Sequence, residues 1–185
     1  MASVPAVRQP DAMTTIKQTL DAGRGRIKLV LPKGMDIDRV INTAMTAIAT
    51  DKEQKLIRCT PHSILRAVIF ATQHGLECGG PLQHGALIPY GQDCTFQPMY
   101  KGLIDISYRS GLVKSISCGA VRENDNFDYH EGTGGFVKHK RDLKAPDETR
   151  GKIYAAWAQA ELPGGAQPFV VLSTADVLRR KKSSQ

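Results

Sequence analysis

The sequence predicts a mixed α+β fold: a single domain with N-terminal helices, a central β-hairpin and antiparallel sheet, and interspersed helices. Before residue 75, apolar residues recur at the spacing of amphipathic helices. After residue 85 the apolar runs are short, several alternate with polar residues, and glycine-containing turns separate them, which is typical of strands. The elements do not follow a strict strand–helix–strand rhythm, and this favours α+β over a parallel α/β fold.

The 185 residues are enough for one substantial hydrophobic core, which we place in residues 36–185. Residues 1–35 mix glycine breakers with cations and predict a flexible basic arm or a subunit contact. Within them we expect a short helix over 16–20 and a short docking strand over 29–31. A frayed terminus with solvated charges is an equally good interpretation. The cations of this segment are Arg24, Arg26, Lys28 and Lys33.

Two helices are predicted at the start of the core. The first begins at Met35 and ends near Lys52, with its apolar residues on one face. Thr60 and Pro61 then supply an N-cap and a first-turn proline, and a second helix continues from them to Gly75, a left-handed cap. Both helices are predicted to serve packing.

A hairpin and a third helix follow. Residues 85–90 and 94–97 are predicted strands around the turn formed by residues 91–93. The third helix covers residues 99–110 and ends at Gly111. The remaining predicted elements are strands over 112–122, 127–130, 152–162 and 167–172, and a last helix that begins at Ser173 or Thr174.

The charge of the chain favours an anionic partner. Lys and Arg exceed Asp and Glu by a formal +7, which is typical of proteins that meet nucleic acid, anionic membrane or acidic protein. No apolar run approaches the roughly 20 residues of a membrane span. The N-terminus also lacks the charged start and apolar stretch of a signal peptide. We therefore expect a cytoplasmic protein that binds nucleic acid and no membrane.

The sequence offers little for catalysis. The four cysteines form no C-x-x-C pair, so we expect reduced, mostly buried thiols, no metal site and no cofactor. There is no G-x-x-x-x-G-K-[ST] loop to hold ATP phosphates. No carboxylate cluster has the arrangement expected of a nuclease, although a metal-dependent nuclease that uses Asp105 or Asp142 remains an alternative. We predict that the protein is not an enzyme.

The first candidate binding surface lies on the third predicted helix. Lys101, Asp105 and Arg109 are four residues apart and share one helix face, where the acid can hold both cations extended toward a phosphate. A solvated ion ladder is the alternative. The helix start is also a natural anion site. Phe96 and Tyr100 flank it and suit contacts with bases, although such aromatics more often belong to a core.

The second candidate is a basic segment after the glycine turn at 132–135. We expect a mobile cationic loop that closes over a phosphate backbone. Its alternative is a charged surface loop that neighbouring acids partly neutralise. The acids at 123–131 are expected to face away from nucleic acid, or toward a basic neighbour in an oligomer. The cations of the loop are Lys138, His139, Lys140, Arg141 and Lys144.

Several motifs together resemble the RecT family of phage single-strand annealing proteins. The resemblance covers about residues 37–180. Its motifs are Leu76-Glu77-Cys78, Gly85-Ala86-Leu87-Ile88-Pro89-Tyr90, Phe96-Gln97-Pro98-Met99-Tyr100-Lys101-Gly102-Leu103-Ile104-Asp105, Arg109-Ser110-Gly111, Val121-Arg122-Glu123-Asn124-Asp125, Phe127-Asp128-Tyr129 and Lys138-His139-Lys140.

The resemblance implies an ATP-independent protein of recombination and repair. It implies binding of single-stranded DNA and of the annealed duplex by a homo-oligomer, either a ring or a helical filament. It also implies a partner exonuclease and contact with host single-strand-binding protein. Family members make such contacts through a C-terminal tail, and within these residues we expect the annealing core without that tail. A passive single-strand-binding module is the nearest alternative function.

The resemblance implies an α+β core in which DNA lies in a positively charged groove. Carried over to this sequence, the groove residues are expected to be Gln97, Tyr100, Lys101, Arg109, Lys138, Lys140 and Arg141. Lys114 joins them as a candidate DNA-binding residue because it belongs to the cationic and aromatic run over residues 83–122.

Overall fold

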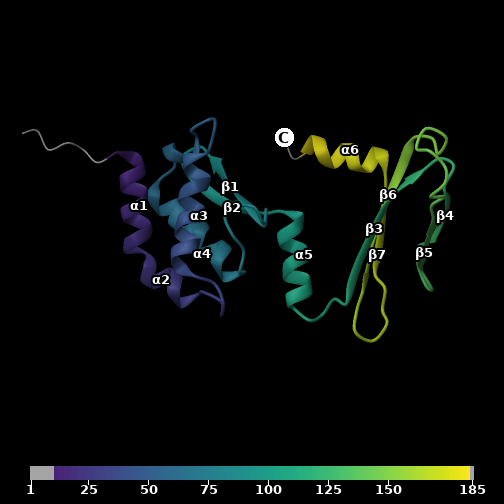
Figure 1. The fold of residues 1–185 in the computed structure, drawn as a ribbon, viewed down its shortest axis with the longest axis horizontal. Coiled ribbons are helices and arrows are strands. Elements are labelled where there is room, and N and C mark those ends of the chain that lie inside the picture. Colours follow the sequence, from purple (N-terminus) through teal and green to yellow (C-terminus); the bar gives the residue numbers. More distant parts are fainter. Residues whose placement is uncertain (1–10, 184–185) are drawn as a thin grey trace, which may run out of the picture. The chain divides into compact units, whose positions relative to one another are not determined.

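The structure, a computed structural model, describes residues 11–183, and its contacts divide the chain into two compact units (Figure 1). Unit 1 is Met1–Ile106 and unit 2 is Ser107–Gln185. The boundary falls within a single helix, α5 (Tyr100–Arg109). Helices build most of unit 1 and antiparallel strands build most of unit 2, so the predicted mixed α+β fold is confirmed.

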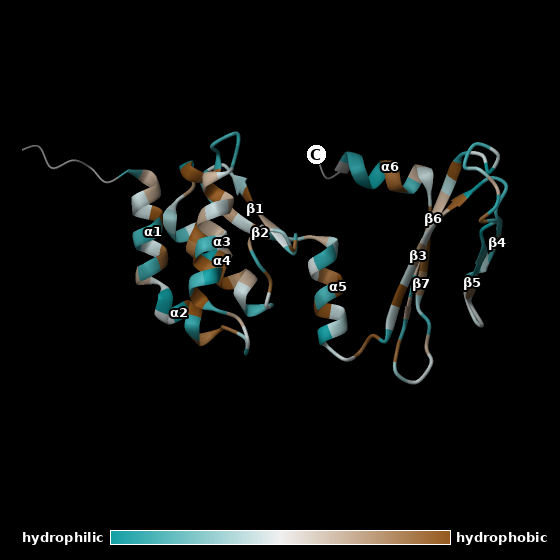
Figure 2. Cartoon of the chain, in the orientation of Figure 1, coloured by the Kyte–Doolittle hydropathy of each residue, from teal (hydrophilic) through white to brown (hydrophobic). Residues whose placement is uncertain are grey.

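Unit 1 is built on helices whose apolar residues meet in one core. Ile64 and Val68 of α4 are fully buried, as are Leu20 and Ile27 from the N-terminal helices. Figure 2 shows the hydrophobic residues of α3 and α4. The helices are α1 (Ala12–Ala22), α2 (Arg24–Leu29), α3 (Ile37–Ala49), the 3₁₀ helix η1 (Leu56–Arg58) and α4 (Pro61–Gln73).

Side-chain caps fix the starts of the two predicted helices. The carboxylate of Asp36 accepts a hydrogen bond from the backbone N–H of Arg39 (2.8 Å) at the start of α3. Thr60 caps α4 in the same way, with Pro61 in its first turn. Gly75 lies just past α4 with φ +66°, the left-handed conformation that the sequence predicts. Both helix predictions are confirmed.

The expected short strand over residues 29–31 is wrong, because α2 continues to Leu29. Ile16, Leu20 and Ile27 are buried, and their spacing of four and seven residues keeps them on one helical face. Gly23 ends α1 and precedes α2, and a Cβ there would come within 2.5 Å of a Leu65 methyl group, so glycine lets this junction lie close to α4. The role of residues 1–35 as an arm or a subunit contact stays a prediction.

The predicted hairpin is present. Strands β1 (Gly85–Tyr90) and β2 (Asp93–Pro98) pair antiparallel, with Leu87 opposite Phe96, and Gly91 turns the chain at φ +61°. Leu87, Phe96 and Cys94 are buried, and β2 packs on α4. Burial raises the pKa of the Cys94 thiol to about 12, so this cysteine is an inert part of the core.

Unit 2 contains a three-stranded antiparallel sheet and a separate hairpin. The sheet order is β3–β6–β7, with β6 (Ile153–Glu161) between β3 (Ser115–Arg122) and β7 (Phe169–Ser173). The hairpin joins β4 (Asn126–His130) to β5 (Phe136–Lys140). Helix α6 (Thr174–Ser183) follows β7. Within residues 11–183, no helix combines the length and apolar character needed to cross a lipid bilayer.

Candidate nucleic-acid interface

In unit 1 the cations and aromatics of the candidate site lie where β2 leads into α5. The backbone N–H of Met99 donates to the carbonyl of His84 (2.8 Å), and Gly102 lies so close that a Cβ there would be 2.2 Å from the same oxygen. The ammonium group of Lys101 donates to Oε1 of Gln83 (2.7 Å). Close backbone packing and this hydrogen bond hold the first turn of α5 against residues 83–85.

The two aromatic residues that flank this turn have different surroundings. Phe96 is 7% exposed and belongs to the core of unit 1. Tyr100 is 67% exposed, next to the exposed Lys101 and two residues past the end of β2, whose Gln97 is also exposed. Tyr100 is therefore the aromatic that is accessible for stacking with a base, and Phe96 has the core role that the sequence left open.

Arg109 and Lys114 belong to unit 2. Arg109 is exposed at the C-terminal end of α5. Lys114 precedes β3, and its ammonium group is 3.7 Å from a carboxylate oxygen of Glu161 with both side chains largely exposed. Exposed pairs of this kind contribute about 0–1 kcal/mol, so the pair does not prevent Lys114 from contacting a phosphate.

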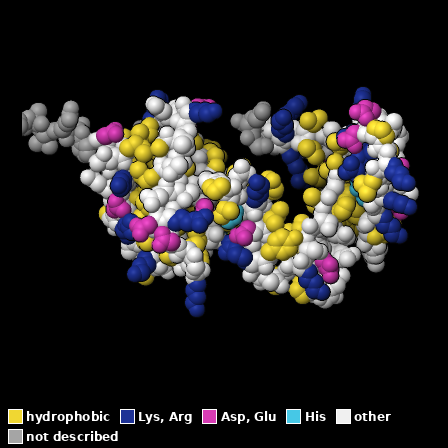
Figure 3. Space-filling view, in the orientation of Figure 1, with side chains coloured by type: hydrophobic (Ala, Val, Ile, Leu, Met, Phe, Trp, Pro, Cys, Tyr) yellow, Lys and Arg dark blue, Asp and Glu magenta, His cyan; other side chains and the backbone are white. Residues whose placement is uncertain are grey.

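The basic segment at 138–140 is a strand, and the expectation of a mobile loop is wrong for these residues. Lys138 and Lys140 lie in β5, opposite Asp128 and Asn126 of β4. Both lysines are exposed, and the ammonium group of Lys138 lies 4.8 Å from the centroid of the Phe136 ring. Figure 3 shows Lys and Arg side chains gathered over the β4–β5 hairpin. Regular pairing therefore holds the two lysines on one face.

His139, between the two lysines, points to the opposite face and is held there on both ring nitrogens. The indole N–H of Trp157 donates to its Nδ1 (3.0 Å), and its Nε2 is 3.0 Å from a carboxylate oxygen of Asp125. An indole nitrogen can only donate, so Nδ1 accepts and Nε2 carries the proton toward Asp125. This pair of hydrogen bonds fixes β5 against β6.

Asp125 is the centre of this cluster. Its carboxylate accepts two hydrogen bonds from Arg150 (2.8 and 2.7 Å) and one from the backbone N–H of Arg122 (3.0 Å). The Asp125 and Arg150 side chains are 1% and 6% exposed. Hydrogen bonding from the Arg150 guanidinium, ahead of the Arg122 amide and His139, holds the pKa of Asp125 well below its usual range.

These contacts correct the expected acidic surface at residues 123–131. Asp125 is buried in the cluster with Arg150, and Glu123 accepts a hydrogen bond from the backbone N–H of Lys152 (3.0 Å). Asp128 and Glu131 are exposed. The sequence suggested a continuous acidic surface because the pattern of charges does not show that Asp125 compensates a buried arginine.

Arg141 is separated from the two lysines of β5. It lines a cavity of about 330 Å³ together with His139, Trp157 and residues of β3. The predicted DNA-binding residues around the β4–β5 hairpin thus lie on two faces, with Lys138 and Lys140 on one and Arg141 with the cavity on the other. Trp157 and Arg150, which the sequence did not suggest as binding residues, belong to the second face.

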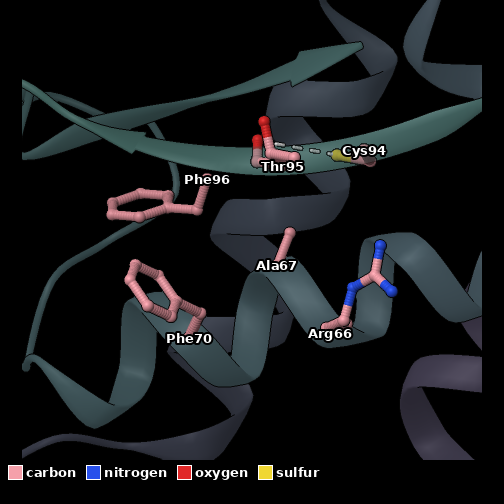
Figure 4. A pocket seen from close by; sticks show the side chains of 6 residues that line it. All are labelled: Arg66, Ala67, Phe70, Cys94, Thr95 and Phe96. Atoms are coloured by element: carbon pink, nitrogen blue, oxygen red, sulfur yellow. Dashed lines mark hydrogen bonds between the residues drawn. The ribbon is translucent and has the colours of Figure 1, made fainter. Parts of the chain in front are cut away.

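A second cavity, of about 260 Å³, lies between α4 and β2 in unit 1 (Figure 4). Phe70 and Phe96 form its walls, with their ring centroids 6.5 Å apart, and Arg66 stands at its edge. Arg66 and Phe70 are four residues apart on the exposed face of α4. Residues four apart share one face of a helix, so this spacing is the sequence signal for an exposed stripe on α4. The sequence analysis assigned this helix to packing alone.

Among residues 11–183, His, Cys, Asp and Glu side chains nowhere form a group of three that could hold a metal ion. Asp142, one of the two acids named for a nuclease, is exposed, and its carboxylate accepts a hydrogen bond from the backbone N–H of Lys144 (2.9 Å).

Comparison with known proteins identifies the family. The model of the RecT family matches residues 38–185. Protein RecT of Escherichia coli (strain K12) is 29% identical over 177 residues, which is 91% of this chain and 62% of that protein. The uncharacterized protein YqaK of Bacillus subtilis (strain 168) is 31% identical over 83 residues, which is 45% of this chain and 29% of YqaK. The chain therefore spans less than two thirds of either relative, and it belongs to the RecT family.

Proposed function

We propose that this protein binds single-stranded DNA and anneals complementary strands without ATP, in homologous recombination. The observation that carries the proposal is the family match, which spans the residues that present the exposed cations of α5 and β5. Exposed lysines on a regular strand and an exposed tyrosine beside a lysine are suitable groups for a phosphate backbone and for bases. The net charge of +7 agrees with such a partner.

Annealing by this route needs no nucleotide hydrolysis. Cations that neutralise phosphates release counterions and lower the repulsion between two strands. A homo-oligomer, as a ring or a helical filament, repeats the cationic surface so that weak sites add along one strand. Exposed bases can then test their register against a second strand, and stacking of about 1.4 kcal/mol per step rewards the correct match.

Partners beyond DNA are part of the same proposal. An exonuclease that produces the single strand would supply the substrate, and host single-strand-binding protein would be displaced from it. The chain spans 62% of the E. coli relative, so contacts with these proteins are assigned to the family as a whole and not to particular residues of this chain.

The test is an annealing assay with labelled complementary oligonucleotides and no nucleotide triphosphate. We expect the protein to raise the annealing rate at low salt and to raise it less as the salt concentration increases. The affinity for the single strand should fall in parallel, with a slope of log affinity against log salt concentration of about −0.7 for each phosphate contact. A protein that binds the strands but slows their pairing would be a passive coat. An unchanged rate over a range of salt and stoichiometry would reject the proposal.

A further inference from the structure

The cavity beside Trp157 in unit 2 has the composition of an anion site. It measures about 330 Å³ and lies among β3, β6, the end of β5 and the segment that precedes β6. Arg122, Arg141 and Arg150 line it, and Asp147 is the carboxylate among its lining residues. With the buried Asp125 behind Arg150, three guanidinium groups face two carboxylates. The cluster therefore keeps one uncompensated positive charge.

Asp147 occupies the position that an external anion would take. One of its carboxylate oxygens accepts a hydrogen bond from Arg150 (2.9 Å) and the other accepts one from Arg122 (3.1 Å). Its side chain is nevertheless 56% exposed, in the exposed segment between β5 and β6. Water reaches the Asp147 carboxylate but little of Arg150 and Arg122, which are 6% and 23% exposed, so an anion from solution contacts their N–H groups by taking the place of Asp147. Asp147 is consequently a replaceable ligand of a fixed pair of arginines.

The two arginines keep their positions by contacts that do not involve Asp147. Arg150 donates from Nε and Nη2 to the buried carboxylate of Asp125. Arg122 donates from Nη1 to the carbonyl of Gly151 (2.8 Å). Each guanidinium therefore has one edge fixed by the protein and one N–H that points to the same carboxylate. Preorganised donors of this kind lose little conformational entropy when a ligand binds.

We propose that this cavity binds one phosphodiester group of single-stranded DNA, which replaces the Asp147 carboxylate between Arg122 and Arg150 and contacts Arg141. The inference rests on the proposed function and adds a site to it. A phosphodiester carries one negative charge, as the Asp147 carboxylate does, and two non-bridging oxygens that match the two guanidinium N–H groups which Asp147 now accepts from. Asp147 acts as a built-in competitor that weakens binding.

The floor of the cavity supports a site of fixed shape. A Cβ at Gly119 would come within 2.8 Å of the indole nitrogen of Trp157 and 3.2 Å of Nδ1 of His139, so β3 lies directly on their hydrogen bond. Trp157 is also the single tryptophan of the chain. Tryptophan fluorescence therefore comes from this one side chain, which lines the cavity.

The first arm of the test changes Asp147→Asn and compares it with Glu148→Gln. The two variants remove the same charge from adjacent exposed positions, but Asp147 alone bridges the two arginines. We expect Asp147→Asn to tighten oligonucleotide binding, measured by fluorescence anisotropy, by roughly threefold to tenfold more than Glu148→Gln, the effect of one freed charge-assisted contact. Equal effects of the two variants would overturn the proposal.

The second arm follows Trp157 emission while an unlabelled oligonucleotide is added. We expect a saturable change in the wild-type protein, a smaller change in Arg141→Gln, and a wild-type response in Lys152→Gln, which removes the same charge from an exposed position outside the cavity lining. Inorganic phosphate is titrated in parallel. If phosphate reproduces the full emission change and the oligonucleotide causes none, the site holds a free anion and the proposal is wrong.

The two arms separate this inference from the proposed function. Oligonucleotide binding by anisotropy, with no change in Trp157 emission and no difference between the Asp147 and Glu148 variants, would reject the cavity site and leave DNA binding intact. Absence of any binding by the wild-type protein at low salt would reject the proposed function and the inference together. Thermal unfolding by circular dichroism checks that each variant is folded.

Discussion

Asp125 holds together the elements that carry the proposed binding residues of unit 2. Its carboxylate joins β4–β5 to the sheet, because it accepts from His139 of β5 and from Arg150 just before β6. The sequence placed Asp125 among four surface acids, and only the packing reveals the buried arginine that it neutralises. Nothing in the sequence indicates that one acid of a charged segment is buried, since Asp is mostly exposed in proteins.

Replacing Asp125 with Asn is expected to lower the unfolding temperature by several degrees, because it leaves the buried Arg150 without a full counter-charge. The folded-state pKa of Asp125 lies below its ordinary value of 3.8, so its contribution is complete above that value and is lost as pH falls toward the folded pKa. Thermal unfolding at pH 7 and pH 3 checks this. The difference in unfolding temperature between the wild-type protein and Asp125→Asn should be smaller at pH 3 than at pH 7.

Asp128→Asn is the matched control, because Asp128 is an exposed acid of the neighbouring strand. It should change the unfolding temperature little at either pH. A comparable loss in both variants would show that the buried cluster contributes no more than an ordinary surface charge.

At the scale of elements, the sequence predicted those with strong caps and turns and missed those whose pattern depends on packing. Helix α4, the β1–β2 hairpin and α5 appear as expected, since Thr60, Gly91 and Gly111 mark their ends, and α3 appears where the apolar spacing predicts it. Strand β5 was missed because the residue that it buries is His139, a polar side chain that hydrophobic alternation does not register. Helix α2 was missed because Gly23 and Gly25 resembled breakers.

Alanine usually stabilises a helix relative to glycine, but at Gly102 in the first turn of α5 we expect the opposite. Gly102→Ala would place a Cβ 2.2 Å from the carbonyl oxygen of His84, a backbone atom that cannot move aside easily. We expect a loss of about 1–3 kcal/mol in the free energy of unfolding, as for overpacking in a core. Urea denaturation measures it. The same change should also weaken DNA binding, since Lys101 lies in the displaced turn.

Gly25→Ala is the control for this prediction. Gly25 lies in α2 with no atom within 4 Å of an added Cβ. Alanine should therefore stabilise the protein by about 0.5–1 kcal/mol, the ordinary difference between the two residues in a helix. Stabilisation by both variants would mean that the close approach of α5 to residues 83–85 does not exist in solution.

For the molecule as a whole, the sequence shows which cations are available but does not show on which surfaces they lie. It grouped Lys138, Lys140 and Arg141 in one loop, whereas the structure puts two of them on one face of a hairpin and Arg141 at a cavity with Trp157. The face to which a side chain of β5 points depends on how β5 pairs with β4. The sequence did not predict this pairing, because it did not predict strand β5. The family resemblance predicted the binding residues as one set and did not separate these two surfaces.

The contribution of each surface to DNA binding can be counted from salt dependence. Each cation that contacts a phosphate adds about −0.7 to the slope of log affinity against log salt concentration. We expect the double variant Lys138→Gln/Lys140→Gln to make the slope less negative by about 1.4, and Lys101→Gln by about 0.7. Combining all three changes should add these effects, because Lys101 lies in unit 1 and both lysines of β5 lie in unit 2. Lys17→Gln, an exposed cation of α1, is the control and should leave the slope as it is. An unchanged slope in the β5 double variant would exclude that face of the β4–β5 hairpin from the DNA path.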